Sequence, residues 1–213
     1  MISLLYNGEI VLFTLIVIAL VLSLGFHEFG HAMVAKINGD NTAELAGRLT
    51  LNPLAHVDPV GLLMVVLVGF GYAKPVPTNP GNFRSRRADL WVAGAGPAMN
   101  LILAIGAWNF FLFMRALGVE YFMQPEPVQF FVLLVQINLV LMIFNLIPLG
   151  PLDGNYILPH FLPRRMASTY REYNARYGNY ALFGLIILGV LGVPIFSYVL
   201  SVGAALIPLI TFF

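Results

Sequence analysis

The chain has 213 residues, of which 59% are hydrophobic and 10% are charged. Soluble domains carry about 25% charged residues, so this composition excludes a disordered chain, a coiled coil and a standard soluble enzyme. The net charge of +1 gives no basic surface for nucleic acid, and the absence of cysteine excludes disulfides and thiolate metal ligands. Any metal site must therefore be built from His, Asp and Glu.

Five apolar stretches follow one another along the chain. They are Ile10–Ile37, Gly61–Phe70, Ala88–Leu117, Val128–Pro148 and Tyr180–Phe213. The second has about half of the roughly 20 residues that a spanning helix needs, which predicts a re-entrant segment that dips into the membrane and returns. The last is interrupted near Val193-Pro194, so it predicts two helices.

The polar stretch after the first apolar segment predicts a short β element. Residues Thr42 to Leu51 alternate well enough for a membrane-associated strand or hairpin, and the turn-rich pairs Asn52-Pro53 and Asp58-Pro59 follow. An exposed strand there could bind an extended polypeptide segment by strand addition.

The basic residues predict the orientation of the chain in the membrane. Two clusters carry them: Lys36, Arg48, Lys74, Arg84, Arg86 and Arg87, and then Arg164, Arg165, Arg171 and Arg176. The positive-inside rule places both clusters in the cytoplasm, which predicts five spans with the N-terminus outside and the C-terminus cytoplasmic. The fold class is an all-α polytopic protein of the cell (inner or plasma) membrane, with about five to six transmembrane segments, the β element and the re-entrant segment.

The end of the first apolar segment carries the motif His27-Glu28-Phe29-Gly30-His31. A spacing of four places both imidazoles on one helical face, where they can bind one zinc ion, and Glu28 is placed to take a proton from water. The alternative is a polar helix end with histidines bonded to backbone or headgroups. Three ionisable groups within an apolar segment are costly, which favours a metal site.

A catalytic zinc needs a third protein ligand, and Asp153 is the best candidate. The predicted topology places it at the same depth and on the same side as His27 and His31. Taken alone, Asp153 could equally be a turn aspartate, since Pro151 and Gly154 flank it closely. With a metal site predicted nearby, the ligand interpretation is preferred.

These motifs resemble the site-2 protease family, the intramembrane zinc metalloproteases, in a compact form without a PDZ or other regulatory domain. The resemblance rests on the histidine motif, on the run from Asn145 to Gly154, and on Gly94-Ala95-Gly96-Pro97-Ala98-Met99-Asn100. It implies that His27, His31 and Asp153 bind one Zn²⁺ per chain and that Glu28 is the catalytic base. One departure is Leu149-Gly150-Pro151, where Ile-Pro-Pro is more usual.

Several other residues have two interpretations. Asn145 could bond the substrate backbone or a developing oxyanion, which we favour, or join helices. The small residues Gly94, Gly96 and Ala98 suit either close helix packing or a substrate role. The loop histidines, His56 and His160, are left out of the metal set because such residues are more often structural.

The resulting prediction is a single intramembrane metalloprotease domain over residues 1–213, with a catalytic core at 9–160 and candidate gate helices at 178–213. It would hydrolyse peptide bonds within or next to the transmembrane segment of a single-pass membrane protein in the lipid bilayer, for example an anti-sigma factor or a signal-peptide remnant. The alternative is a transporter or metal-permeation protein that uses the same cluster as an ion site. The lack of inverted repeats and of a second ionisable cluster disfavours it.

Overall fold

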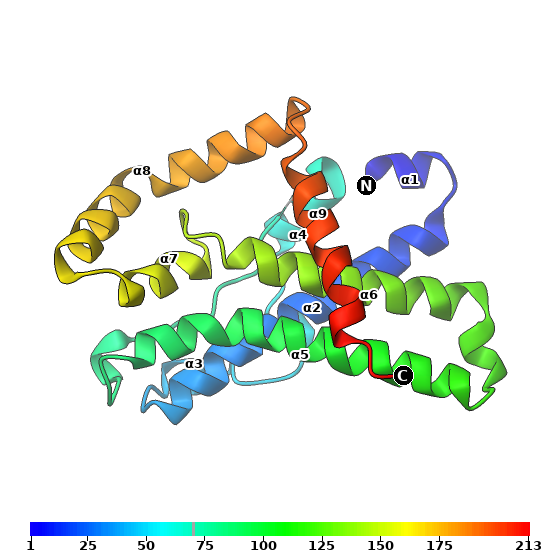
Figure 1. Cartoon of the computed structure of the whole chain (residues 1–213), viewed down its shortest axis with the longest axis horizontal. Coiled ribbons are helices and arrows are strands. Elements are labelled where there is room, and N and C mark those ends of the chain that lie inside the picture. The colour runs from blue at the N-terminus through cyan, green and yellow to red at the C-terminus, as the bar shows by residue number, and fades with distance from the viewer. Residues whose placement is uncertain (70) are drawn as a thin grey trace.

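The computed structural model describes residues 1–69 and 71–213, and this part of the chain is helical and contains no strand (Figure 1). The α-helices are α1 (Ile2–Tyr6), α2 (Ile10–Ile37), α3 (Thr42–Leu45), α4 (Pro59–Val68), α5 (Ala88–Ala116), α6 (Pro125–Asn145), α7 (Asp153–Ile157), α8 (Arg164–Val190) and α9 (Ile195–Leu206). Short 3₁₀ turns are η1 (Pro53–Ala55), η2 (Pro80–Asn82), η3 (Glu120–Met123), η4 (Leu158–Phe161) and η5 (Ile207–Ile210).

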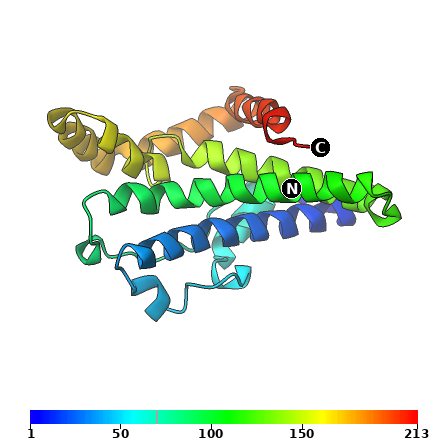
Figure 2. The same cartoon turned by 60° about the horizontal axis from the view of Figure 1, so that its bottom comes forward.

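Helices α2, α5 and α6 pack side by side and form the core of the molecule (Figure 2). Gly30 lets the backbone of α2 approach that of α5 closely. A Cβ at this position would overlap the carbonyl of Ala95 and the side chain of Met99 on α5. Close approach over small residues is a common way for membrane helices to associate. Midway along α5 and α6, the buried residues Ala104, Val135 and Leu139 form an apolar cluster with Ile210 of η5.

By length and composition, three helices are able to cross a membrane: α2, α5 and α6. A fourth span is present if α8 and the segment Ile195–Ile210, which meet at 90°, count as one broken span. The predicted five to six transmembrane segments are therefore not confirmed. The physical reason is length: the apolar part of α8 runs only from Tyr180 to Val190 and α9 has 12 residues, so neither alone supplies the roughly 20 apolar residues of a span.

The predicted strand at Thr42–Leu51 is not found. Its first residues form α3, which Asp40 initiates by accepting hydrogen bonds from the backbone nitrogen and the hydroxyl of Thr42. Gly47, at φ +68°, follows in a conformation that favours glycine. Such local bonds from a side chain to the backbone compete with strand pairing, so we do not retain strand addition at this segment.

The short segment after Asp58 doubles back on itself. Helix α4 spans Pro59–Val68, and Asp58 caps it by accepting from the nitrogens of Val60 and Gly61, both at 2.9 Å. The Lys74 nitrogen then donates to the His56 carbonyl (2.9 Å), so the chain returns to where the segment began. The re-entrant segment itself stays a prediction, and its predicted end, Phe70, lies outside the described residues.

Candidate metal centre

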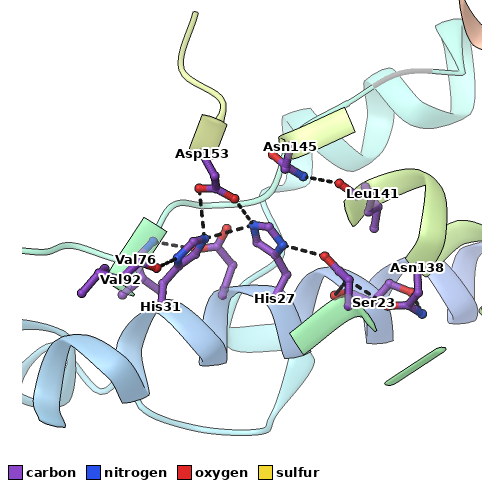
Figure 3. A network of polar contacts seen from close by, with 11 residues as sticks. Ser23, His27, His31, Val76, Val92, Asn138, Leu141, Asn145 and Asp153 are labelled. Carbon is purple, nitrogen blue, oxygen red and sulfur yellow. Dashed lines mark hydrogen bonds and ion pairs between the residues drawn. The ribbon is translucent and has the colours of Figure 1, made fainter. Parts of the chain in front are cut away.

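The structure brings together the side chains of His27, His31 and Asp153. His31 and Asp153 are 122 positions apart in the sequence. The one-turn spacing on α2 aligns both imidazoles, and α7 directs its first residue, Asp153, toward them (Figure 3). The two histidine Nε2 atoms are 3.0 Å apart, and they lie 3.2 Å and 3.3 Å from the two carboxylate oxygens of Asp153. One ligand atom from each residue therefore fits within 4.8 Å of the others.

The outer ring nitrogens determine which atoms face the centre of this group. Nδ1 of His31 lies 2.7 Å from the carbonyl of Val92, which can only accept, so this Nδ1 carries the proton. Nδ1 of His27 lies 2.7 Å from Oδ1 of Asn100, whose Nδ2 donates to Ser23 O and to Asn138 Oδ1. Both Nε2 atoms then face each other and a carboxylate, an arrangement that a cation bound between them would satisfy.

The donor set fits zinc. Tetrahedral coordination with bonds of about 2.0–2.1 Å separates neighbouring ligand atoms by about 3.3 Å, close to the 3.0 Å between the two Nε2 atoms and the 3.2 Å between His27 Nε2 and Asp153 Oδ2. Oδ2 of Asp153 is buried and accepts no hydrogen bond from the described part of the chain, so it is free to ligate. Gly96 of α5 faces the same point, where a Cβ would overlap both imidazoles.

Glu28 is buried beside this group, with 8% of its surface exposed. Its Oε2 accepts a hydrogen bond from the backbone nitrogen of Val76 (2.8 Å), in the extended segment that follows α4. Arg48 supports that segment by donating to the carbonyls of Lys74 and Pro75. The Glu28 carboxylate is thus held through Oε2 by the Val76 backbone, and the residue is next in sequence to His27.

Asn145 is partly buried at the end of α6, and its Nδ2 donates to the Leu141 carbonyl of the same helix (2.9 Å; Figure 3). Among the described residues, no hydrogen bond joins it to the histidines or to Asp153. The fully buried His56 contacts the Thr50 carbonyl and Arg48, and therefore holds the loop together.

Comparison with known proteins agrees with this geometry. The sequence profile of peptidase family M50 matches residues 15–124 and 118–189. The chain belongs to peptidase family M50. It is 41% identical over 189 residues to YwhC of Bacillus subtilis, covering 87% of this chain and 83% of that protein. It is 34% identical over 161 residues to Rip2 of Mycolicibacterium smegmatis, covering 71% of this chain and 59% of that protein. Both relatives are named "putative zinc metalloprotease". No solved structure matches the chain.

Sequence reasoning singled out the stretch from Gly94 to Asn100 of this M50 chain, but it did not predict that one face of α5 contacts the two histidines. Val92, Gly96 and Asn100 follow one another at intervals of four, so they lie along one side of the helix. Each contacts a histidine or leaves room for it. The signal available in the sequence was Asn100, an amide in an apolar run that must find a partner when buried.

Proposed function

We propose that this M50 peptidase hydrolyses peptide bonds within or next to the transmembrane segment of a membrane protein. The observation that carries the proposal is the convergence of two imidazole lone pairs and a carboxylate at α2, a helix long and apolar enough to span a membrane. As a zinc metalloprotease, the chain would hold one Zn²⁺ through His27, His31 and Asp153. Bound there, zinc supplies polarisation of the scissile carbonyl and acidification of the attacking water.

Glu28 performs the proton transfers in this scheme. Its carboxylate takes a proton from the attacking water and returns it to the leaving amine nitrogen. The hydrogen bond from Val76 to Oε2 fixes the side chain, which leaves Oε1 to face the reactants. Asn145 has a second amide hydrogen besides the one given to Leu141, and this hydrogen binds the substrate carbonyl.

The substrate in this proposal is a single-pass membrane protein, such as a membrane-bound anti-sigma factor or a signal-peptide remnant. A helical substrate hides its peptide bonds, so its helix must unwind locally before attack. Helices α8 and α9, which meet at a sharp bend, are the candidate gate for entry from the bilayer. We place the protein in the cell membrane with the N-terminus outside and the C-terminus in the cytoplasm, as the arginine and lysine clusters predict.

The test compares wild type with Glu28→Gln in proteoliposomes that contain single-pass peptides with labelled transmembrane segments. We expect Glu28→Gln to bind zinc normally and to cleave about 10²- to 10⁴-fold more slowly, the usual contribution of a general base. Glu126→Gln is the matched control, because Glu126 is exposed at the opposite end of α6. A metal flux that changes in Glu28→Gln, with no proteolysis in either form, would instead support a metal-permeation protein.

A further inference from the structure

The turn that delivers Asp153 is bonded to α8. This turn, residues 146–152, joins α6 to α7. Asn174 of α8 accepts a hydrogen bond from the Gly150 nitrogen (3.0 Å) and donates one to the Gly150 carbonyl (3.1 Å). One turn earlier on the same helix, the hydroxyl of Tyr170 donates to the Pro148 carbonyl (2.9 Å). Three hydrogen bonds from α8 therefore fix the backbone just before Asp153.

Gly150 suits this arrangement in two ways. Its φ of +59° lies in the left-handed region, and its backbone N–H donates a hydrogen bond to Oδ1 of Asn174. A proline at this position has neither feature, since its φ is fixed near −65° and it lacks an N–H. Where the more usual pattern has a proline, this chain thus has Gly150, whose backbone N–H and carbonyl both bond the Asn174 amide of α8.

Apolar packing holds α8 against the same turn. The buried side chains of Phe144, Leu152 and Leu182 form one cluster, which joins the end of α6, the residue before Asp153 and α8. Gly178 lets α8 approach closely, because a Cβ there would lie 3.0 Å from the Gly150 Cα. The contact between turn and helix is therefore both directional and close-packed.

We propose that Asn174 and Tyr170 are positioning residues for the third metal ligand, and that α8 sets the place of Asp153 through them. This inference rests on the proposed zinc site. Helix α7 has only five residues, so the direction of its first side chain depends on the turn that precedes it. The two histidines, by contrast, lie within the 28-residue helix α2, and among the described residues their rings are held by Asn100 and Val92 of α5 without a contact to α8. A displacement of α8 carries the Gly150 turn, and Asp153 with it.

The experiment measures zinc affinity of the full chain in detergent by competition with a chelator, together with the visible absorption of the cobalt(II)-loaded protein. Asn174→Ala removes two of the three bonds, and we expect about tenfold weaker zinc binding and altered cobalt bands. Asn174→Asp keeps the acceptor for the Gly150 nitrogen and restores part of the affinity. Tyr170→Phe has a smaller effect. Asn179→Ala is the matched control, since Asn179 is an exposed amide on the same helix.

The outcomes separate the inference from the function on which it rests. Wild-type affinity and an unchanged cobalt spectrum in Asn174→Ala would overturn the positioning role, while the zinc site itself would stand. The positioning role is equally overturned if the variant lowers only the thermal stability of the metal-free protein, because a purely structural contact does that. A wild type that binds no zinc, although well folded, would overturn the proposed function as well.

Discussion

The two ends of the α5–α6 pair are stabilised by different physics. One end is aromatic: the rings of Phe111 and Phe131 stack with centroids 5.2 Å apart, Phe122 lies against both, and the guanidinium of Arg115 lies 5.5 Å from the Phe111 ring. The other end holds the metal group, where polar side chains and backbone carbonyls make hydrogen bonds of 2.7–3.0 Å. Apolar packing therefore stabilises the aromatic end, and directional hydrogen bonds stabilise the end that holds the histidines and Asp153.

The difference also concerns distance along the chain. The aromatic contacts join residues of α5, η3 and α6, which follow one another in the sequence. These contacts therefore connect segments that are close together along the chain. The metal end joins α2, α5, the turn before α7 and α8. Directional bonds are what such an assembly needs, because each fixes one side chain at one place.

Removal of the third ligand should have the largest effect at the metal end. Asp153→Ala leaves two imidazoles and no carboxylate, one ligand fewer than a catalytic zinc site requires. We expect bound zinc to fall from about one per chain to nearly none, measured by elemental analysis of purified protein. Retention of zinc by the variant would mean that another residue completes the site.

Truncation at the aromatic end should separate stability from metal binding. Phe111 is 1% exposed, so Phe111→Ala leaves a cavity and costs about 3 kcal/mol of stability. We expect a lower unfolding temperature in detergent but an unchanged zinc affinity. A parallel loss of zinc affinity would show that the two ends are coupled through α5 and α6 and do not act independently.

Adding a single methyl group at Gly96 should weaken zinc binding at the metal end and leave the aromatic end unchanged. Gly96→Ala places a Cβ against both imidazoles, and such overpacking costs about 1–3 kcal/mol, or about five- to 150-fold in zinc affinity. Gly94→Ala is the matched control, because nothing lies within 4 Å of a Cβ at Gly94. Equal zinc affinities for the two variants would remove Gly96 from the site.

The smallest effect is expected in the loops outside the metal end. Burial raises the pKa of Asp40, but hydrogen bonds from Thr42, Asn79 and Asn82 outweigh it and hold the pKa below its usual value. The carboxylate thus contributes stability above its ordinary pKa of about 3.9, and this contribution is lost as the pH falls through the lowered value. Asp40→Asn should cost about 1 kcal/mol per lost hydrogen bond near pH 7.

The check on Asp40 is a series of thermal unfolding curves. The difference in stability between wild type and Asp40→Asn should shrink as the pH falls below about 4. A difference that stays constant from neutral to acid pH would contradict the role of the charged carboxylate.

The long helices and the candidate ligand set of His27, His31 and Asp153 follow from simple patterns in the sequence. Helix α2 has the predicted bounds, Ile10–Ile37, and α5 ends one residue before its predicted end, because apolar length alone defines a span. The helical spacing of His27 and His31 also predicts that their rings share one face. Asp153 required the topology as well, since only the positive-inside rule placed it on the same side.

Other features depend on contacts that leave no regular pattern in the sequence. The Asn100 amide and the Asn174 amide each bond a partner far away along the chain, at 2.7–3.1 Å, and no periodicity indicates either pair. The segment at Thr42 alternates like a strand, but a local hydrogen bond from the Thr42 nitrogen to the Asp40 carboxylate favours a turn there. The first half of α8 has the composition of a charged loop, although its residues form a continuous helix with the apolar half.

The scattered origin of the site has a consequence for biosynthesis. Two ligands are present once residue 31 has been made, but Asp153 and the α8 residues that hold its turn are made much later. A nascent chain that has inserted only α2, α5 and α6 lacks the complete donor set. If these residues hold zinc as proposed, a nascent chain shorter than 153 residues lacks one metal ligand, so we expect no peptidase activity before Asp153 and α8 have been synthesised.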